Sequence, residues 1–126
     1  MKQITSEWIT KAEGDFATAQ RELRATDHTN YDAVCFHAQQ CVEKYLKAFL
    51  QESNVSFPRT HDLAELLSLS LTIESAWAWM AADLNTLSAF AVEYRYPGDS
   101  ADLDEARESF EKCTNIRDVI RRAMNV

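Results

Sequence analysis

Apolar side chains recur along the chain at spacings of three and four residues, which is the pattern of amphipathic α-helices. No segment sustains the alternation of apolar and polar residues that predicts a β-strand, and only two glycines and two prolines interrupt the chain. The pattern therefore predicts an all-α fold, namely an up-and-down four-helix bundle with one additional short helix.

Capping residues predict where the first three helices begin. Thr5 or Ser6 is expected to cap the first helix, and Thr29 the second, which should run to about Glu52. Thr60 is expected to cap the short helix that starts directly after it. Each hydroxyl would accept a hydrogen bond from a backbone N–H that has no partner within its helix.

Two more helices complete the predicted bundle. One should run from about Glu74 to a stop at Pro97-Gly98, and it includes an aromatic stretch at 77–80. The last should begin after Ser100, with acidic residues near its start and arginines near its end, where each charge suits the helix dipole.

The length of 126 residues suits one domain, residues 1–126, with one core. No stretch approaches the roughly 20 apolar residues that a membrane-spanning helix needs. The N-terminal residues turn polar too soon for a secretory signal. We therefore expect a cytoplasmic protein that makes no use of a membrane.

Charge and cysteine usage exclude further classes of function. Lysines and arginines total 13 against 20 acidic residues, and the net charge of -7 opposes general DNA binding. A local cationic pocket could still bind one nucleotide or a short RNA, because salt screens distant charges. Cys35, Cys41 and Cys113 form no CxxC pair and are expected to be reduced and buried, and the three histidines are too far apart to predict a metal site. No metal or cofactor is expected.

A polar row on the second predicted helix is the first candidate site. His37, Gln40, Lys44 and Lys47 follow one another by three, four and three residues, which places them on one helix face beside an apolar stripe. Glu43 precedes Lys47 by four residues and could hold that lysine by an ion pair. The row suits a binding groove, but a solvated helix face has the same pattern, and both interpretations stay open.

Two helix ends are further candidates, because ends carry unpaired backbone groups that accommodate ligands. One is Thr60-His61-Asp62, at the start of the short helix. The other is Tyr94-Arg95-Tyr96, where an arginine stands between two stacking surfaces and could bind a phosphate or carboxylate in bidentate fashion. Arg95 could equally be a helix-terminal cation that neutralises nearby carbonyls.

Three blocks of this sequence together resemble the HEPN domain. They are the run from Cys35 to Ala48, which contains Glu-Lys-Tyr-Leu-Lys-Ala, then Phe57-Pro-x-Thr-His-Asp-Leu, then Tyr94-Arg-Tyr-Pro, and nearly the whole chain is covered. The resemblance implies a helical bundle, commonly a dimer, that binds nucleotides or works beside a small nucleotidyltransferase in a toxin–antitoxin-like pair. Some relatives are metal-independent ribonucleases that carry an arginine followed, after four to six residues, by a histidine. After Arg95 those positions hold Ser100, Ala101 and Asp102, so the ribonuclease pair is absent.

We therefore expect a non-catalytic HEPN-like module that binds a nucleotide or a nucleotidyltransferase partner and forms a homodimer. Its ligand-binding residues would be His37, Gln40, Lys44, Lys47, His61 and Arg95, supported by Glu43, Asp62, Tyr94 and Tyr96. Two alternatives remain. One is an endoribonuclease toxin with an atypical pair, in which Arg95 steadies the transition state and His37 or His61 moves the proton. The other is a structural dimerisation domain that uses Trp77-Ala78-Trp79-Met80 as its interface.

Overall fold

A computed structural model describes residues 1–93 and 96–126 of the chain. These residues form α1 (Gln3–Arg24), α2 (Tyr31–Glu52), α3 (Leu63–Ser70), the 3-10 helix η1 (Ser75–Trp79), α4 (Met80–Glu93) and α5 (Leu103–Met124). No strand occurs in the described ranges, so the all-α prediction, with four long helices and a short one, is confirmed. Within those ranges, no helix combines the length and apolar character that crossing a membrane requires.

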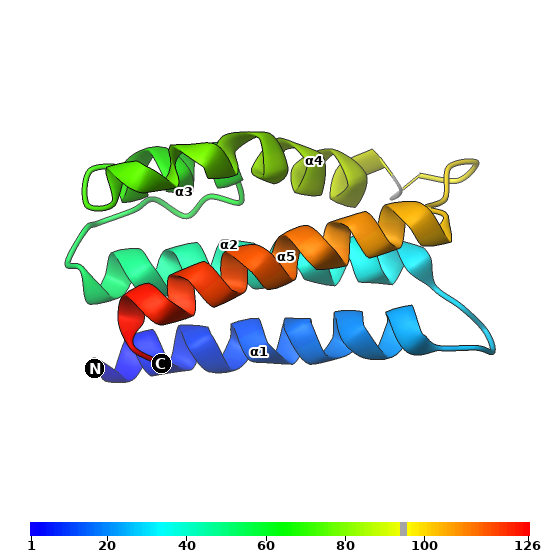
Figure 1. Ribbon diagram of the computed structural model, residues 1–126, viewed down its shortest axis with the longest axis horizontal. Coiled ribbons are helices and arrows are strands. Elements are labelled where there is room, and N and C mark those ends of the chain that lie inside the picture. The colour runs from blue at the N-terminus through cyan, green and yellow to red at the C-terminus, as the bar shows by residue number, and fades with distance from the viewer. Residues whose placement is uncertain (94–95) are drawn as a thin grey trace.

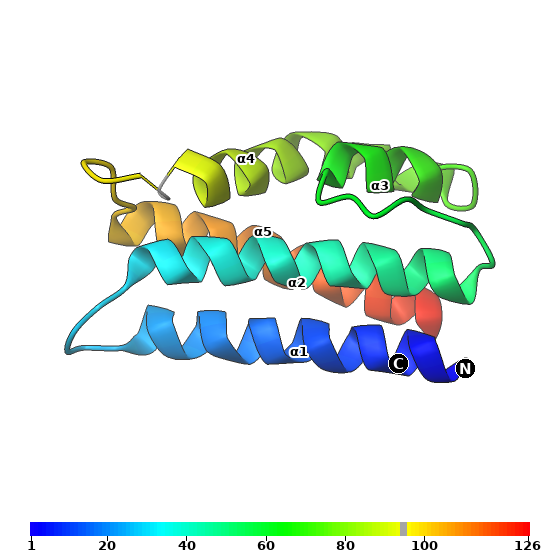
Figure 2. The same cartoon turned by 180° about the vertical axis from the view of Figure 1, so that it is seen from behind.

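Helix α2 is the centre of the bundle. It packs against α1, α3, α4 and α5, and both views show α1 on one side of the α2–α5 pair with α3 and α4 on the other (Figures 1 and 2). Contact with four neighbours explains why α2 is apolar over most of its circumference. Its buried apolar residues are Val34, Cys35, Ala38, Cys41, Val42, Tyr45, Leu46, Ala48, Phe49 and Leu50.

The predicted caps of the first two helices are wrong. Helix α1 starts at Gln3, and Thr5 lies inside it, buried, where its hydroxyl donates a 3.0 Å hydrogen bond to the Glu52 carboxylate. Helix α2 is capped by Asn30, whose side-chain oxygen accepts from the backbone N–H of residue 33. The predicted cap of α2, Thr29, stands directly before the true one, whereas Lys2, the residue before α1, makes no side-chain cap hydrogen bond.

Acidic residues cap the later helices. Asp62, not Thr60, caps α3 by accepting from the backbone N–H groups of residues 64 and 65. The Thr60 hydroxyl instead accepts from the Asp62 N–H. Asp102 and Glu105 form a reciprocal capping box at the start of α5. Asp62, which was predicted to support a ligand site, thus serves as the N-cap of α3.

The aromatic stretch at 77–80 divides between core and surface. Trp77 is buried against Phe49, with ring centroids 4.4 Å apart, and Met80 is fully buried. Trp79 alone is exposed among the three large side chains, at 44%. Because η1 and α4 direct Trp77 and Met80 into the core, an interface formed by the whole stretch at 77–80 would require the core to unpack. Gly98 has a φ of 98°, in the left-handed region that favours glycine. This backbone conformation is consistent with the predicted helix stop at Pro97-Gly98.

Candidate functional site

The polar row on α2 meets a carboxylate from α1. His37 Nδ1 lies 2.7 Å from one oxygen of Asp15, and Lys44 Nζ donates to the other. The Asp15 side chain is only 10% exposed. A carboxylate that is removed from water needs such partners. The structure therefore brings His37 and Lys44 together, but it engages both of them in an intramolecular cluster.

The second half of the row surrounds Glu43. Its carboxylate accepts from Lys47 at 3.1 Å and lies 3.1 Å from Nδ1 of His61. The predicted Glu43–Lys47 ion pair is thus confirmed, and it is buried, with 3% and 7% of the two side chains exposed. The His61 side chain, by contrast, is 85% exposed. Glu43 therefore links a buried ammonium group to an imidazole at the surface.

Glutamine amides connect this cluster to a cavity. Gln39 Nε2 donates to Glu43 at 3.3 Å, and Gln40 Nε2 donates to Gln39 Oε1 at 2.8 Å. The cavity, of about 330 Å³, lies between α2, α4 and the segment before α3, and we call it the amide groove. It is lined by Phe36, Gln39, Gln40, His61, Ser88, Ala91 and Val92.

His61 also lines a second cavity, of about 430 Å³, which we call the aromatic pocket. It is formed where the segment between α2 and α3 passes α1, and it is lined by Trp8, Lys47, Phe57, Pro58, Arg59, Thr60 and His61. His61 belongs to both cavities. The predicted row thus divides: Gln40 lines the amide groove, Lys47 lines the aromatic pocket, and neither cavity is lined by His37 or Lys44.

Of the remaining predicted residues, Tyr94 and Arg95 lie outside the described residues, and Asp62 lines neither cavity. Tyr96 is described and is 67% exposed. Gln39, Trp8 and Arg59 were not predicted to belong to a site. Trp8 shared the spacing of the core stripe, and Arg59 stood alone in a connection, so neither carried a distinguishing signal.

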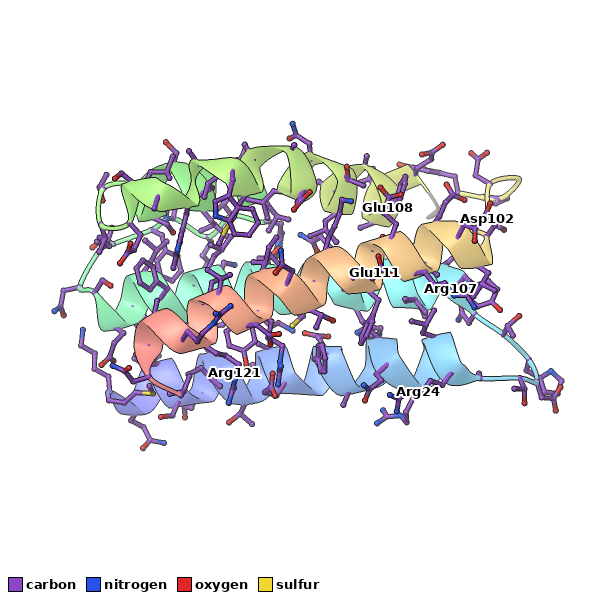
Figure 3. All side chains as sticks on the ribbon, in the orientation of Figure 1. Arg24, Asp102, Arg107, Glu108, Glu111 and Arg121 are labelled. Atoms are coloured by element: carbon purple, nitrogen blue, oxygen red, sulfur yellow. The ribbon has the colours of Figure 1, made fainter. Side chains whose placement is uncertain are left out.

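A third polar cluster, also not predicted, joins three helices. Glu13 on α1 accepts two hydrogen bonds from Arg117 on α5, at 2.6 and 2.7 Å, and one from the Tyr45 hydroxyl at 2.6 Å. Arg121, which Figure 3 shows on α5 beside α1, donates to the same hydroxyl at 2.9 Å. The hydrogen bonds from Arg117 lower the pKa of Glu13 against the opposing effect of burial. Burial and the bond to Glu13 raise the pKa of Tyr45, so the Glu13 carboxylate is favoured in its charged form and the Tyr45 phenol in its neutral form, which donates to that carboxylate.

The three cysteines are free and buried, as predicted. Burial raises the pKa of Cys35, and the hydrogen bond to Cys113 together with burial raises that of Cys41. Thiols held in this way are poor nucleophiles and poor metal ligands. Among the residues that the structure describes, no group of histidine, cysteine and acidic side chains could hold a metal ion.

The charge balance defines what the two cavities could bind. Lys44 is neutralised by Asp15 and Lys47 by Glu43. Among its described lining residues, the amide groove carries no lysine or arginine, only amides, a hydroxyl, an imidazole and apolar groups. Amides offer both donors and acceptors, so this groove suits a ligand with a hydrogen-bonding edge rather than a bare anion.

Comparison with known proteins identifies relatives of this arrangement. The family model described as HEPN domain matches residues 5–123. The crystal structure of an archaeal HEPN homologue is similar with a TM-score of 0.70 and 24% sequence identity, and the match covers 98% of this chain and 98% of the other. At that identity the similarity concerns the fold alone. No curated protein matches the chain.

Proposed function

The chain belongs to the HEPN domain family, and from that membership we propose that it is a non-catalytic binding module of the cytoplasm. Its ligand is a nucleotide, or a small nucleotidyltransferase with which it forms a toxin–antitoxin-like pair. We place the ligand at the amide groove, with Gln40 and His61 as binding residues and Glu43 in support. Arg95, Tyr94 and Tyr96 stay in the proposal as sequence predictions.

One observation supports this proposal above the others: Gln39, Gln40 and His61 converge on one cavity from two segments of the chain. Their polar atoms are connected through Glu43, which restricts their orientations before any ligand arrives. Orientation in advance lowers the entropy cost of binding. A purine or pyrimidine edge presents the alternating donors and acceptors that two amides and an imidazole can pair.

Calorimetric titration with ATP, GTP and short RNAs tests this function. We expect saturable binding of at least one of them, weakened about five-fold in Gln40→Ala, since one hydrogen bond contributes about 1 kcal/mol. Gln20→Ala is the matched control, because Gln20 lies on α1 and lines neither cavity. Equal affinity in wild type and Gln40→Ala, or no heat with any nucleotide or RNA, would remove the amide groove as a nucleotide site.

The proposed partners require separate tests. We propose a homodimer as the working form, and sedimentation of the purified chain would measure it directly. In the dimerisation alternative Trp79 is the residue to change, because it is exposed whereas Trp77 and Met80 are buried. A dimer that survives Trp79→Glu would clear this surface of the role.

A second candidate function, ribonuclease activity, is favoured by the contact between His37 and Asp15. An imidazole whose Nδ1 is held by a carboxylate can exchange a proton at Nε2, as a general base requires. We nevertheless expect RNA to stay intact when it is incubated with excess protein and EDTA, because Lys44 shares the same carboxylate and the histidine after Arg95 is absent. Cleavage that is lost in His37→Gln would establish the enzyme instead.

A further inference from the structure

The aromatic pocket has a composition that the amide groove lacks. Trp8 on α1 and Phe57 after α2 meet edge to face, with centroids 6.4 Å apart and planes inclined at 60°. Both side chains are half-buried, so each keeps part of its ring accessible from the pocket. Pro58 follows Phe57 and fixes the backbone there, which limits how far this wall can move. The pocket thus offers an aromatic surface whose side chains lose little conformational entropy when a ligand binds.

Cationic groups lie beside these rings. Lys47 Nζ lies 5.4 Å from the centroid of the Trp8 ring, and its charge is balanced by Glu43. Arg59 is exposed, lines the same pocket, and has no ion pair within the described part of the chain. The pocket therefore carries one uncompensated positive charge from Arg59 on a protein whose net charge is -7.

We propose that the aromatic pocket is a second binding site, for a planar ring system that carries a phosphate, as a nucleoside monophosphate does. The ring lies against Trp8 and Phe57, and the phosphate is bound by the Arg59 guanidinium. Stacking on aromatic side chains accepts any base, and a guanidinium pairs with two phosphate oxygens at once. The Thr60 hydroxyl and the exposed His61 line the same cavity and can add hydrogen bonds.

This inference goes beyond the function proposed above, because it concerns another cavity and other residues. Among the described residues that line them, the two cavities share only His61. A ligand in the amide groove depends on Gln40, whereas a ligand in the aromatic pocket depends on Trp8 and Arg59. Either site can therefore fail in an experiment while the other remains.

Tryptophan fluorescence tests the aromatic pocket directly. In a Trp79→Phe background the remaining tryptophans are Trp8, which lines the pocket, and Trp77, which is buried in the core. Titration with AMP at fixed ionic strength should quench the emission saturably. Adenosine, which has the ring without the phosphate, should bind roughly ten-fold more weakly, since bonds to charged groups are the stronger ones. Titration with a short oligoribonucleotide that lacks a terminal phosphate shows whether the pocket prefers a free nucleotide or a nucleotide within a strand.

Substitutions test which residue binds the phosphate of the ligand and which binds its ring. Arg59→Gln should weaken AMP roughly ten-fold and leave adenosine unchanged. Arg24→Gln is the control, because Arg24 is also exposed but lies at the opposite end of α1 (Figure 3). Trp8→Phe should abolish the quenching, and calorimetry with AMP measures the affinity that remains.

Specific outcomes would overturn the inference. They are the absence of saturable AMP binding, equal affinity for AMP and adenosine, and an equal loss in Arg24→Gln and Arg59→Gln, which would indicate nonspecific attraction. Quenching that Gln40→Ala removes and Arg59→Gln does not would place the nucleotide in the amide groove alone. Circular dichroism and the thermal midpoint of each variant show whether it is folded.

Discussion

Replacing Glu43 by alanine should lower the free energy of unfolding by about 3–5 kcal/mol, the cost of leaving a buried charge without its partner. The Lys47 ammonium group would then stay in a site where only 7% of its side chain is exposed. His61 and Gln39 would lose their common acceptor at the same time. Urea denaturation followed by circular dichroism measures the change.

The chain contains a matched control for this substitution. Glu108 and Lys112 on α5 (Figure 3) form an ion pair with the same spacing of four residues and the same 3.1 Å distance between nitrogen and oxygen. The Glu108 side chain, however, is 46% exposed. Glu108→Ala should cost less than about 1 kcal/mol, as exposed pairs do. The double variant Glu43→Ala/Lys47→Met should recover much of the loss, because no buried charge remains. Equal costs for Glu43→Ala and Glu108→Ala would mean that water reaches Lys47.

The helices could be predicted from the sequence because their apolar spacing is local information. The apolar residues of α2 cover so wide an arc of the helix that several neighbours are needed to bury them, and the structure shows contacts with α1, α3, α4 and α5. The helix boundaries could be predicted less accurately, because Thr29 and Asn30 are both good caps and only the folded chain selects one of them. A choice between adjacent residues of similar propensity depends on tertiary contacts that no local window contains.

The polar row on α2 was found for the same reason, but the partners of its members were not. The spacing of Glu43 and Lys47 predicts their contact, because four residues bring side chains together on one helix. Asp15 lies 22 residues from His37 and 29 from Lys44. Nothing in the sequence distinguishes Asp15 from other acidic residues of α1. The spacing therefore predicts a polar row on one face of α2, but it could not show that Asp15 and Glu43 neutralise the lysines of that row.

Acid should weaken the fold through Glu13, the residue that joins α1 to α5 and to Tyr45. Hydrogen bonds from Arg117 hold the pKa of this carboxylate below the ordinary value of 4.5. A group whose pKa is lower in the folded state contributes stability that is fully present above the ordinary value. That contribution is lost as the pH falls through the lowered pKa, because the folded state must then take up the proton that the unfolded state already carries.

Glu13→Gln isolates this contribution. At pH 7 the variant should be less stable by about 1–2 kcal/mol, the lower part of the range for bonds to charged groups, since a third of the Glu13 side chain is exposed and screened. The difference between wild type and variant should shrink as the pH is lowered from 5 to 3. Glu111→Gln serves as the control, because Glu111 is exposed on α5 (Figure 3) and should change little at any pH. A loss in Glu13→Gln that stays constant over this pH range would show that packing, rather than the charge of Glu13, joins the three helices.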